Sequence, residues 1–240
     1  MTFTLIARCR ETSKVGVCIA TGSPSVGGRC IFAAAGVGAI SFQATAEPRL
    51  GQLGLDLLKF GYSPQKVLEE LISTDPFHEW RQVGIVDARG RAAARTGPKA
   101  RNVAGHLIVD QHVVLGNRVA HEGVIQAISR GFEAAKGQSF EERLMRGIEA
   151  GGAAGGQIEG QVSSAILTYG HLPVAYVDLR VDLNVEPIAE LRRILDWHQP
   201  LLDYYVERLD NPELPLHKDW LEQRNITREF SRPTKAISDV

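Results

Sequence analysis

The sequence predicts an α+β fold in which antiparallel sheets form the centre and helices cover them. Strands and helices are expected in two rounds, each a run of strands followed by a pair of helices, rather than in strict alternation. The strands expected at 3–7, 15–19 and 37–42 carry apolar or small residues on both faces, so both faces should be covered. These observations predict a four-layer αββα sandwich, with two antiparallel sheets face to face and the helices outside.

The first round contains four strands and two helices. Apolar alternation interrupted by polar turns and glycines predicts the strands, which span 3–7, 15–19, 30–34 and 37–42. Pro48 stands at a favoured first-turn position for the first helix, which Gly61 ends. Ser63 and Pro64 supply a cap and a first-position proline for the second helix, which stops at 75–76.

The second round repeats this order and leads into the C-terminal part of the chain. Its strands are expected at 82–87, 91–96, 106–109 and 113–117, before a helix over 121–136. Ser139 and Glu142 form a capping box for the next helix, which the glycines at 151–152 should end. Two last strands, 161–169 and 174–181, precede a helix that Pro187 opens and Pro200 breaks or kinks.

Composition excludes several classes of function. The 240 residues include 27 basic and 28 acidic side chains, so no positive field favours nucleic acid. The longest apolar runs, such as 30–40, are far too short to span a membrane. Three cysteines in predicted strands, and an N-terminus without a signal-peptide pattern, predict a cytoplasmic, reduced protein. No Cys or His spacing resembles a metal site, and we expect no cofactor.

The predicted domains are residues 1–210 and a C-terminal arm or tail, 211–240, rich in proline and charge. The tail has few apolar anchors, so a partner surface is expected to order it, which predicts a homodimer or larger homo-oligomer. These anchors are Leu214, Leu216, Trp220, Leu221, Ile226 and Phe230.

An ordered set of short motifs runs from Thr2 to about Leu195. They are Thr2-Phe3-Thr4-Leu5-Ile6-Ala7-Arg8, Gly36-Val37-Gly38-Ala39 running to Gln43, Gly54-Leu55-Asp56-Leu57-Leu58, Arg81-Gln82, Val86-Asp87, Thr96-Gly97, Gly116-Asn117, Gly155-Gly156, Ser163, and Val177-Asp178-Leu179-Arg180-Val181. This set resembles a bacterial family of unknown function, domain-of-unknown-function family 1028, in the N-terminal-nucleophile hydrolase-like group. The resemblance implies the same αββα sandwich, and it implies an activity only weakly because a fold does not fix a function.

The sequence departs from this family's usual pattern at several polar positions. Gln157, Glu159 and Val162 stand where the family usually has an acidic residue, a basic residue and a glutamine. Glu47 replaces a common asparagine, and Asp182-Leu183-Asn184 replaces an acidic-acidic-histidine run. Such joint changes predict a different ligand or a loss of activity.

Thr2 is the candidate nucleophile. If the Met1–Thr2 bond is cut, Thr2 carries both a hydroxyl that can attack a carbonyl and an α-amine that can take its proton. An α-amine titrates near ~8, which suits a base at neutral pH. In the alternative interpretation Thr2 is an ordinary residue of the first strand.

The other candidate site residues are polar groups in apolar strands, where they are costly unless paired or facing a cleft. Asn117 offers an amide donor for an oxyanion, and Arg81 or Arg180 could bind a substrate carboxylate. Asp178 and Arg180 share a strand face, and a buried structural ion pair is the alternative for them. The residues assigned to substrate binding are Gln43, Arg81, Ser163, Asp178 and Arg180.

Two functions follow from these patterns. The first is hydrolysis of a small-molecule amide by an N-terminal nucleophile, Thr2, with Asn117 helping to hold the oxyanion. The second is a catalytically inactive protein of the same fold that binds a small anionic metabolite or serves as an assembly module. Other nucleophiles fit less well, since Ser163 lacks the G-x-S-x-G context and Cys18 alternates with core residues.

Overall fold

The structure is a computed structural model that describes residues 1–226. The chain divides into two compact units, Met1–Arg192 and a second unit that begins at Arg193. The boundary expected after residue 210 therefore lies within the second unit, and the separation of a tail at that point stays a prediction.

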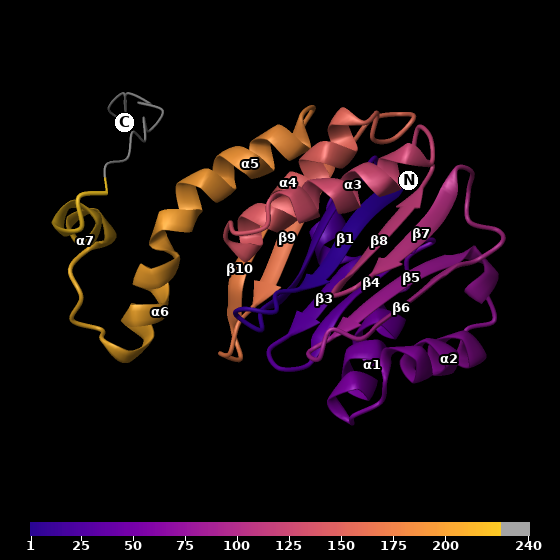
Figure 1. Cartoon of the computed structure of the whole chain (residues 1–240), viewed down its shortest axis with the longest axis horizontal. Coiled ribbons are helices and arrows are strands. Elements are labelled where there is room, and N and C mark those ends of the chain that lie inside the picture. Colours follow the sequence, from indigo (N-terminus) through magenta and orange to yellow (C-terminus); the bar gives the residue numbers. More distant parts are fainter. Residues whose placement is uncertain (227–240) are drawn as a thin grey trace, which may run out of the picture. The chain divides into compact units, whose positions relative to one another are not determined.

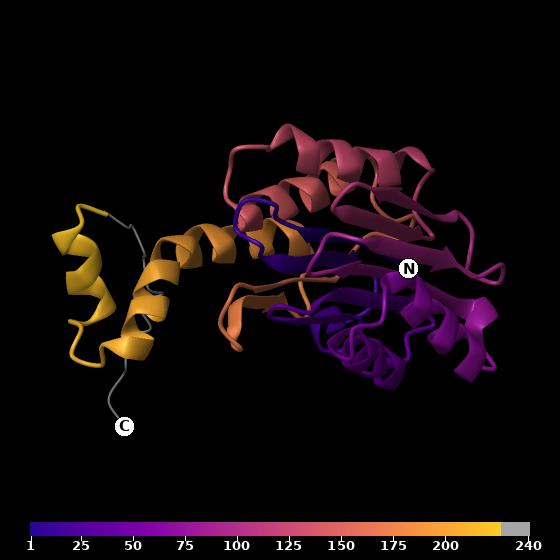
Figure 2. The ribbon, with the colours of Figure 1, turned by 60° about the horizontal axis from the view of Figure 1, so that its bottom comes forward.

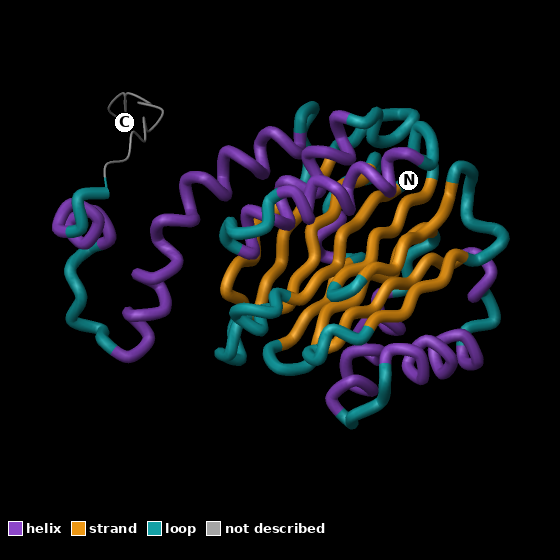
Figure 3. The backbone as a smooth tube through the Cα atoms, viewed as in Figure 1, coloured by secondary structure: helices purple, strands orange, loops and turns teal. Residues whose placement is uncertain are grey.

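Two antiparallel sheets form the centre of the first unit (Figures 1 and 3). The six-stranded sheet has the order β10 (Ala175–Val181), β9 (Ser163–Tyr169), β2 (Val15–Thr21), β1 (Thr2–Arg8), β8 (His112–Asn117) and β7 (Ala104–Val109). The four-stranded sheet has the order β3 (Ile31–Ala34), β4 (Gly38–Ala44), β5 (Arg81–Asp87) and β6 (Ala92–Thr96).

Helices cover the outer face of each sheet (Figure 2). Helices α3 (Gly123–Ala134) and α4 (Phe140–Ala153) lie over the six-stranded sheet, and α1 (Pro48–Lys59) and α2 (Pro64–Thr74) lie over the other. The predicted four-layer αββα sandwich is therefore confirmed.

Strand β1 shows why its sequence is apolar on both faces. Leu5 packs toward α4, where a β-carbon on Gly147 would lie 2.6 Å from Leu5 Cδ2. Ile6 packs toward the other sheet, where a β-carbon on Gly84 would lie 2.7 Å from Ile6 Cδ1. Successive side chains of a strand point to opposite faces, so β1 contributes to two cores at once. The two glycines allow the close approach of the neighbouring layers.

Most predicted helix ends are where the sequence placed them, with one exception. Ser63 Oγ accepts from Lys66 N at 3.3 Å, and Ser139 Oγ accepts from Glu142 N at 3.3 Å, so both caps form. The prediction that glycines 151–152 end α4 is wrong, since the helix continues to Ala153. Gly151 instead serves close packing, because a β-carbon there would lie 2.5 Å from Ile128 Cγ1.

The second unit has a small core of its own. Pro200 breaks the helical run as predicted, with a 3₁₀ turn at Gln199–Leu201 between α5 (Pro187–His198) and α6 (Leu202–Asp210). Helix α7 (His217–Gln223) follows. The core consists of Leu201, Tyr204, Trp220 and Leu221, with Trp197, Leu214 and Ile226 packed against it.

This core changes the reason for expecting an oligomer. Leu214, Trp220, Leu221 and Ile226 pack within their own unit, so a partner surface is not needed to explain their burial. Leu216 is exposed, and Phe230 lies outside the described residues. Self-association stays a prediction. Among residues 1–226, no helix combines the length and apolarity needed to cross a membrane.

Candidate functional site

Four polar side chains form a row at one end of the six-stranded sheet. Asn117 on β8 and Thr21 on β2 are both direct cross-strand partners of Thr2, and Ser163 on β9 is the partner of Thr21. Direct partners present their side chains on the same face. That face is turned toward the other sheet, because Thr4, two residues after Thr2, donates to Gln43 Oε1 on β4. The structure thus brings together three of the predicted site residues and adds Thr21.

Thr2 lies at a small pocket between the sheets. The pocket has a volume of about 100 Å³. The Thr2 side chain is buried, and its Oγ1 lies 3.1 Å from Thr21 Oγ1. Arg29 also lines the pocket, while Asn117 and Ser163 stand beside Thr2 in the row without lining it. The full lining is Met1, Thr2, Thr21, Ser23, Pro24, Val26, Arg29, Cys30, Ala44 and Ala46.

Met1 lines this pocket. Its carbonyl oxygen accepts a hydrogen bond from Thr21 Oγ1. Burial, together with the charges of Arg101 and Arg118, holds the pKa of the Met1 α-amine below its ordinary value of 8.0, against opposite effects of Cys30 and Glu159. Sequence reasoning found no cation near Thr2 other than Arg29. It missed Arg101 and Arg118 because they reach this corner from segments about a hundred residues away, before and after the β7–β8 hairpin.

Asn117 and Gln43 belong to a buried amide network whose centre is Gln82 on β5. Gln82 Oε1 accepts from Gln43 Nε2 at 2.7 Å and from Asn117 Nδ2 at 3.1 Å. Gln82 Nε2, which carries two hydrogens, lies within hydrogen-bond distance of three acceptors: Gly105 O and Gly116 O at 2.8 and 2.9 Å, and Thr96 Oγ1 at 2.9 Å. These bonds join the two sheets, so the network accounts for Gln43 structurally and uses one of the two Asn117 amide hydrogens.

Ser163 holds the loop that borders the Thr2 pocket. Its Oγ donates to Ser23 O at 2.6 Å and accepts from Val26 N at 3.3 Å. Both partners line the pocket. Ser163 is fully buried, so its hydroxyl shapes the pocket wall rather than facing the pocket.

Arg81 is engaged in a buried ion pair away from Thr2. Its Nε donates to Asp75 Oδ2 at 2.9 Å, and its Nη1 donates to Thr45 O at 2.5 Å. Burial would raise the pKa of Asp75, but the bond from Arg81 and one from Phe77 N hold it below its usual 3.8. The guanidinium therefore joins the loops at the ends of β4 and α2.

Asp178 and Arg180 do form the expected ion pair on β10, with contacts of 2.8 and 2.9 Å. The pair is not buried, since the two side chains are 38% and 41% exposed. Strand β10 is at the edge of its sheet, and its alternate residues Asp178 and Arg180 are exposed. Neither residue lines the Thr2 pocket.

The loop over 154–162 brings Gln157 to the same corner as Met1. Backbone bonds hold this loop to neighbouring segments, among them Ala120 N to Gly156 O at 3.0 Å, Ile158 N to Arg118 O at 3.3 Å, and Val162 N to Thr21 O at 2.8 Å. Gln157 is 3% exposed, and neither its Nε2 nor its Oε1 has a hydrogen-bond partner in the described structure. In sequence, Gln157 differs from other polar loop residues only as a departure from the family pattern, because an unpaired amide leaves no signal in sequence.

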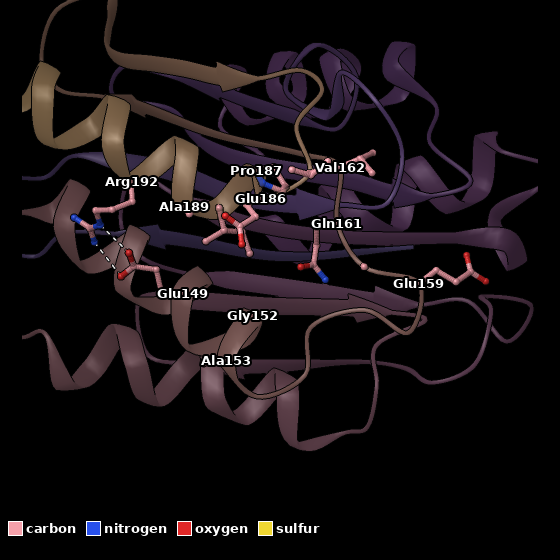
Figure 4. Close-up of a pocket in the computed structure, with 13 residues that line it drawn as sticks. Glu149, Gly152, Ala153, Glu159, Gln161, Val162, Glu186, Pro187, Ala189 and Arg192 are labelled. Atoms are coloured by element: carbon pink, nitrogen blue, oxygen red, sulfur yellow. Dashed lines mark hydrogen bonds and ion pairs between the residues drawn. The ribbon is translucent and has the colours of Figure 1, made fainter. Parts of the chain in front are cut away.

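A larger pocket of about 760 Å³ lies on the other side of this loop (Figure 4). Its charged groups are mostly paired: Arg192 bonds Glu149 at 2.7 and 3.0 Å, and Glu159 pairs with Arg118. Gln161 points into the pocket in Figure 4. Because most of its charges are already paired, this pocket offers less chemistry than the smaller one at Thr2.

The buried cysteines Cys18 and Cys30 are poorer candidate nucleophiles than Thr2. Burial raises the pKa of Cys18, and it raises the pKa of Cys30 to about 11, so both thiols stay protonated at neutral pH. Within residues 1–226, no three His, Cys, Asp or Glu side chains gather closely enough to hold a metal ion.

The fold and this site define an αββα protein of α+β class with a polar, partly unsatisfied corner around its first two residues. A family model described as "Family of unknown function (DUF1028)" matches residues 2–191, and the chain belongs to that family.

Two solved structures are similar to this chain. The crystal structure of protein SPO2555 from Silicibacter pomeroyi, also assigned to DUF1028, is 27% identical with a TM-score of 0.78, covering 92% of this chain and 90% of that one. Anbu (ancestral beta-subunit) from Yersinia bercovieri is 10% identical with a TM-score of 0.39. The match covers 89% of this chain and 100% of that one. No curated protein matches.

Proposed function

We propose that the protein hydrolyses a small-molecule amide, with Thr2 as an N-terminal nucleophile after the Met1–Thr2 bond is cut. The observation that carries this proposal is the position of Thr2. It is the first residue of a central strand, and its hydroxyl faces a pocket beside a second hydroxyl, Thr21 Oγ1, at 3.1 Å. The αββα arrangement supports the proposal only as a fold that presents a strand end between two sheets.

In this reaction Thr2 Oγ1 attacks the amide carbonyl and the free α-amine of Thr2 takes the hydroxyl proton. The amine then returns the proton to the leaving nitrogen, and water hydrolyses the ester that Thr2 carries. Asn117 is the proposed oxyanion donor, because Nδ2 has two hydrogens and one bonds Gln82. The chemistry needs no metal or cofactor.

The charges around the chain end favour a neutral amine. The Met1 amine already has a lowered pKa from burial and from Arg101 and Arg118. A Thr2 amine in the same corner would meet the same cations, which disfavour its protonated form. Turnover should therefore rise with pH and level off below pH 8, since the base is active when deprotonated.

The predicted substrate-binding residues fall into two groups, those that support the pocket and those that lie at the surface. Gln43, Arg81 and Ser163 have structural partners, and we assign them to supporting the pocket. Asp178 and Arg180 stay candidates for binding only at the surface of β10. A cytoplasmic location is retained as part of the proposal, with three free cysteines in keeping with a reducing compartment.

The test compares proteins that begin at Thr2, prepared by cleaving an N-terminal fusion. The parent, Thr2→Ser and Thr2→Val variants are screened against small amides. We expect Thr2→Val, which keeps the shape and loses the hydroxyl, to be slower by at least about 10³-fold, while Thr2→Ser retains activity. Equal turnover by the parent and Thr2→Val would remove Thr2 from the mechanism.

An inactive binding protein or assembly module is the second candidate. Met1 favours it, because with Met1 attached the Thr2 nitrogen is a peptide nitrogen and cannot act as a base. Intact-mass measurement of protein from its natural host separates the candidates, since retention of Met1 supports the second.

A further inference from the structure

The Gln157 carboxamide is buried without a hydrogen-bond partner, although a glutamine side chain offers two donors and a strong acceptor. Leaving such a group unsatisfied costs about 1–3 kcal/mol. Gln157 is only 3% exposed. Neither of its polar side-chain atoms has a hydrogen-bond partner among the described residues. A group of this kind requires an explanation in terms of what else occupies its surroundings.

The Met1 side chain and this carboxamide both approach Gly22. A β-carbon built on Gly22 would lie 3.2 Å from Met1 Cε and 3.6 Å from Gln157 Oε1, so both groups pack against the same glycine. A methyl group cannot hydrogen-bond an amide, so Met1 does not satisfy Gln157. Cutting the Met1–Thr2 bond vacates this space and joins it to the pocket that Met1 and Thr2 line.

Positive charge surrounds the same space. Arg118 Nε is a second buried atom without a hydrogen-bond partner, and Arg118 adopts a left-handed backbone conformation (φ 52°) that costs a non-glycine residue about 1 kcal/mol. Glu159 neutralises part of the Arg118 charge. Arg101 pairs with no carboxylate among residues 1–226, and Arg29 lines the pocket. An anionic group would gain from this field.

We propose that the space vacated by Met1 is the substrate-recognition subsite, and that it takes a small fragment bearing one primary carboxamide and one carboxylate. The carboxamide pairs with Gln157, whose Nε2 donates to the fragment's oxygen and whose Oε1 accepts from its NH₂ group. The carboxylate meets Arg101 and Arg118. This subsite rests on the proposed function, because it is open only when Thr2 is the first residue.

The size of the space limits the fragment. The existing pocket holds about 100 Å³, and loss of Met1 adds the volume of one side chain. Cavities of roughly 150 Å³ accommodate benzene-sized ligands, so the fragment has fewer than about ten non-hydrogen atoms.

The experiment measures binding without turnover. Protein that begins at residue 2 and carries Thr2→Ala is titrated by calorimetry with succinamate, succinate and butyramide, which carry both groups, only the carboxylate and only the carboxamide. Succinamate should bind at least tenfold more tightly than either other probe. Gln157→Leu should weaken succinamate binding at least tenfold, and Arg101→Met should weaken it at low salt.

Two controls make the result specific. Gln161→Leu changes a glutamine of the same loop that faces the larger pocket, and it should leave succinamate binding unchanged. Protein that begins at Met1 should not bind the probe. Gln157→Met provides a second apolar variant of similar length if Gln157→Leu does not fold.

The outcomes separate this inference from the proposed function. Absence of succinamate binding at millimolar concentration, or equal binding by the parent and Gln157→Leu, overturns the subsite. Binding that depends on Gln157 without amide turnover by the Thr2-first protein supports the subsite and counts against the hydrolase. Turnover that is insensitive to Gln157→Leu retains the hydrolase and removes the subsite.

Discussion

Two buried glutamines, Gln82 and Gln157, differ completely in how their amides are satisfied. Gln82 is fully buried and uses both amide atoms, which lie within hydrogen-bond distance of five partner atoms in the two sheets. Gln157 is 3% exposed and uses neither. Residue type and burial are the same, so the difference lies in the neighbours.

The two glutamines lie in different structural surroundings, one in a strand and the other in a loop. Gln82 lies in β5, and its partners are strands and backbone carbonyls that the fold fixes. Gln157 lies in a loop, where its Oε1 and Met1 Cε both approach Gly22, and the proposed cleavage would remove Met1. The described residues therefore account for both amide atoms of Gln82 and for neither amide atom of Gln157.

The largest expected effect comes from breaking the satisfied amide. Gln82→Leu should lower the free energy of unfolding by about 3–5 kcal/mol, because it removes the acceptor of Gln43 Nε2 and Asn117 Nδ2 and the side-chain donor to two backbone carbonyls. Urea unfolding followed by circular dichroism measures the change. A loss below about 1 kcal/mol would mean that water or rearranged side chains satisfy these groups, and that the network does not hold the sheets together.

A smaller loss is expected from Arg81→Met, which leaves the Asp75 carboxylate buried and unpaired. The expected cost is about 3 kcal/mol at pH 7. Because the pKa of Asp75 is depressed in the folded protein, the stabilisation by the pair is complete above about pH 4 and is lost as pH falls through the folded pKa. The difference between the parent and Arg81→Met should therefore shrink below pH 4 in urea titrations.

The exposed pair on β10 is the matched control for that experiment. Asp178→Asn should cost at most about 0.5 kcal/mol, since exposed ion pairs contribute little. A loss comparable to that of Arg81→Met would show that β10 is covered by a partner, as a homo-oligomer would require.

The smallest effect has the opposite sign. In protein that retains Met1, Gln157→Leu should raise the free energy of unfolding by about 1 kcal/mol, because it removes two unsatisfied polar atoms and keeps the volume. Thermal and urea unfolding against the parent measure it. Destabilisation by more than about 1 kcal/mol would indicate that Gln157 has a partner, such as an ordered water, and would end the contrast with Gln82.

Much of the fold was predictable because its signals are local. Caps at Ser63 and Ser139, the break at Pro200 and the two-sided apolarity of β1 depend on neighbours in sequence. The glycines at 151–152 were misread because their role is a contact with Ile128 on another helix, which local rules do not contain.

The site was predictable only in part. Thr2, Asn117 and Ser163 were found from residue type and order, and strand register brings them together. Register also supplies Thr21, whereas Arg101, Arg118 and Gln157 come from loops whose positions no periodicity encodes. The polar role of Arg81 was recognised, but its partner Asp75 had been read only as a helix stop.

The place of β1 at the centre of its sheet has a consequence for the timing of maturation. The strand is paired along its length with β2 on one side and β8 on the other, and the Met1 carbonyl is held by Thr21. A processing enzyme must draw the chain end into its own active site, which the finished sheet does not permit. If the Met1–Thr2 bond is cut as proposed, we therefore expect the cut while the chain is still being synthesised, and we expect a molecule that folds first to keep Met1.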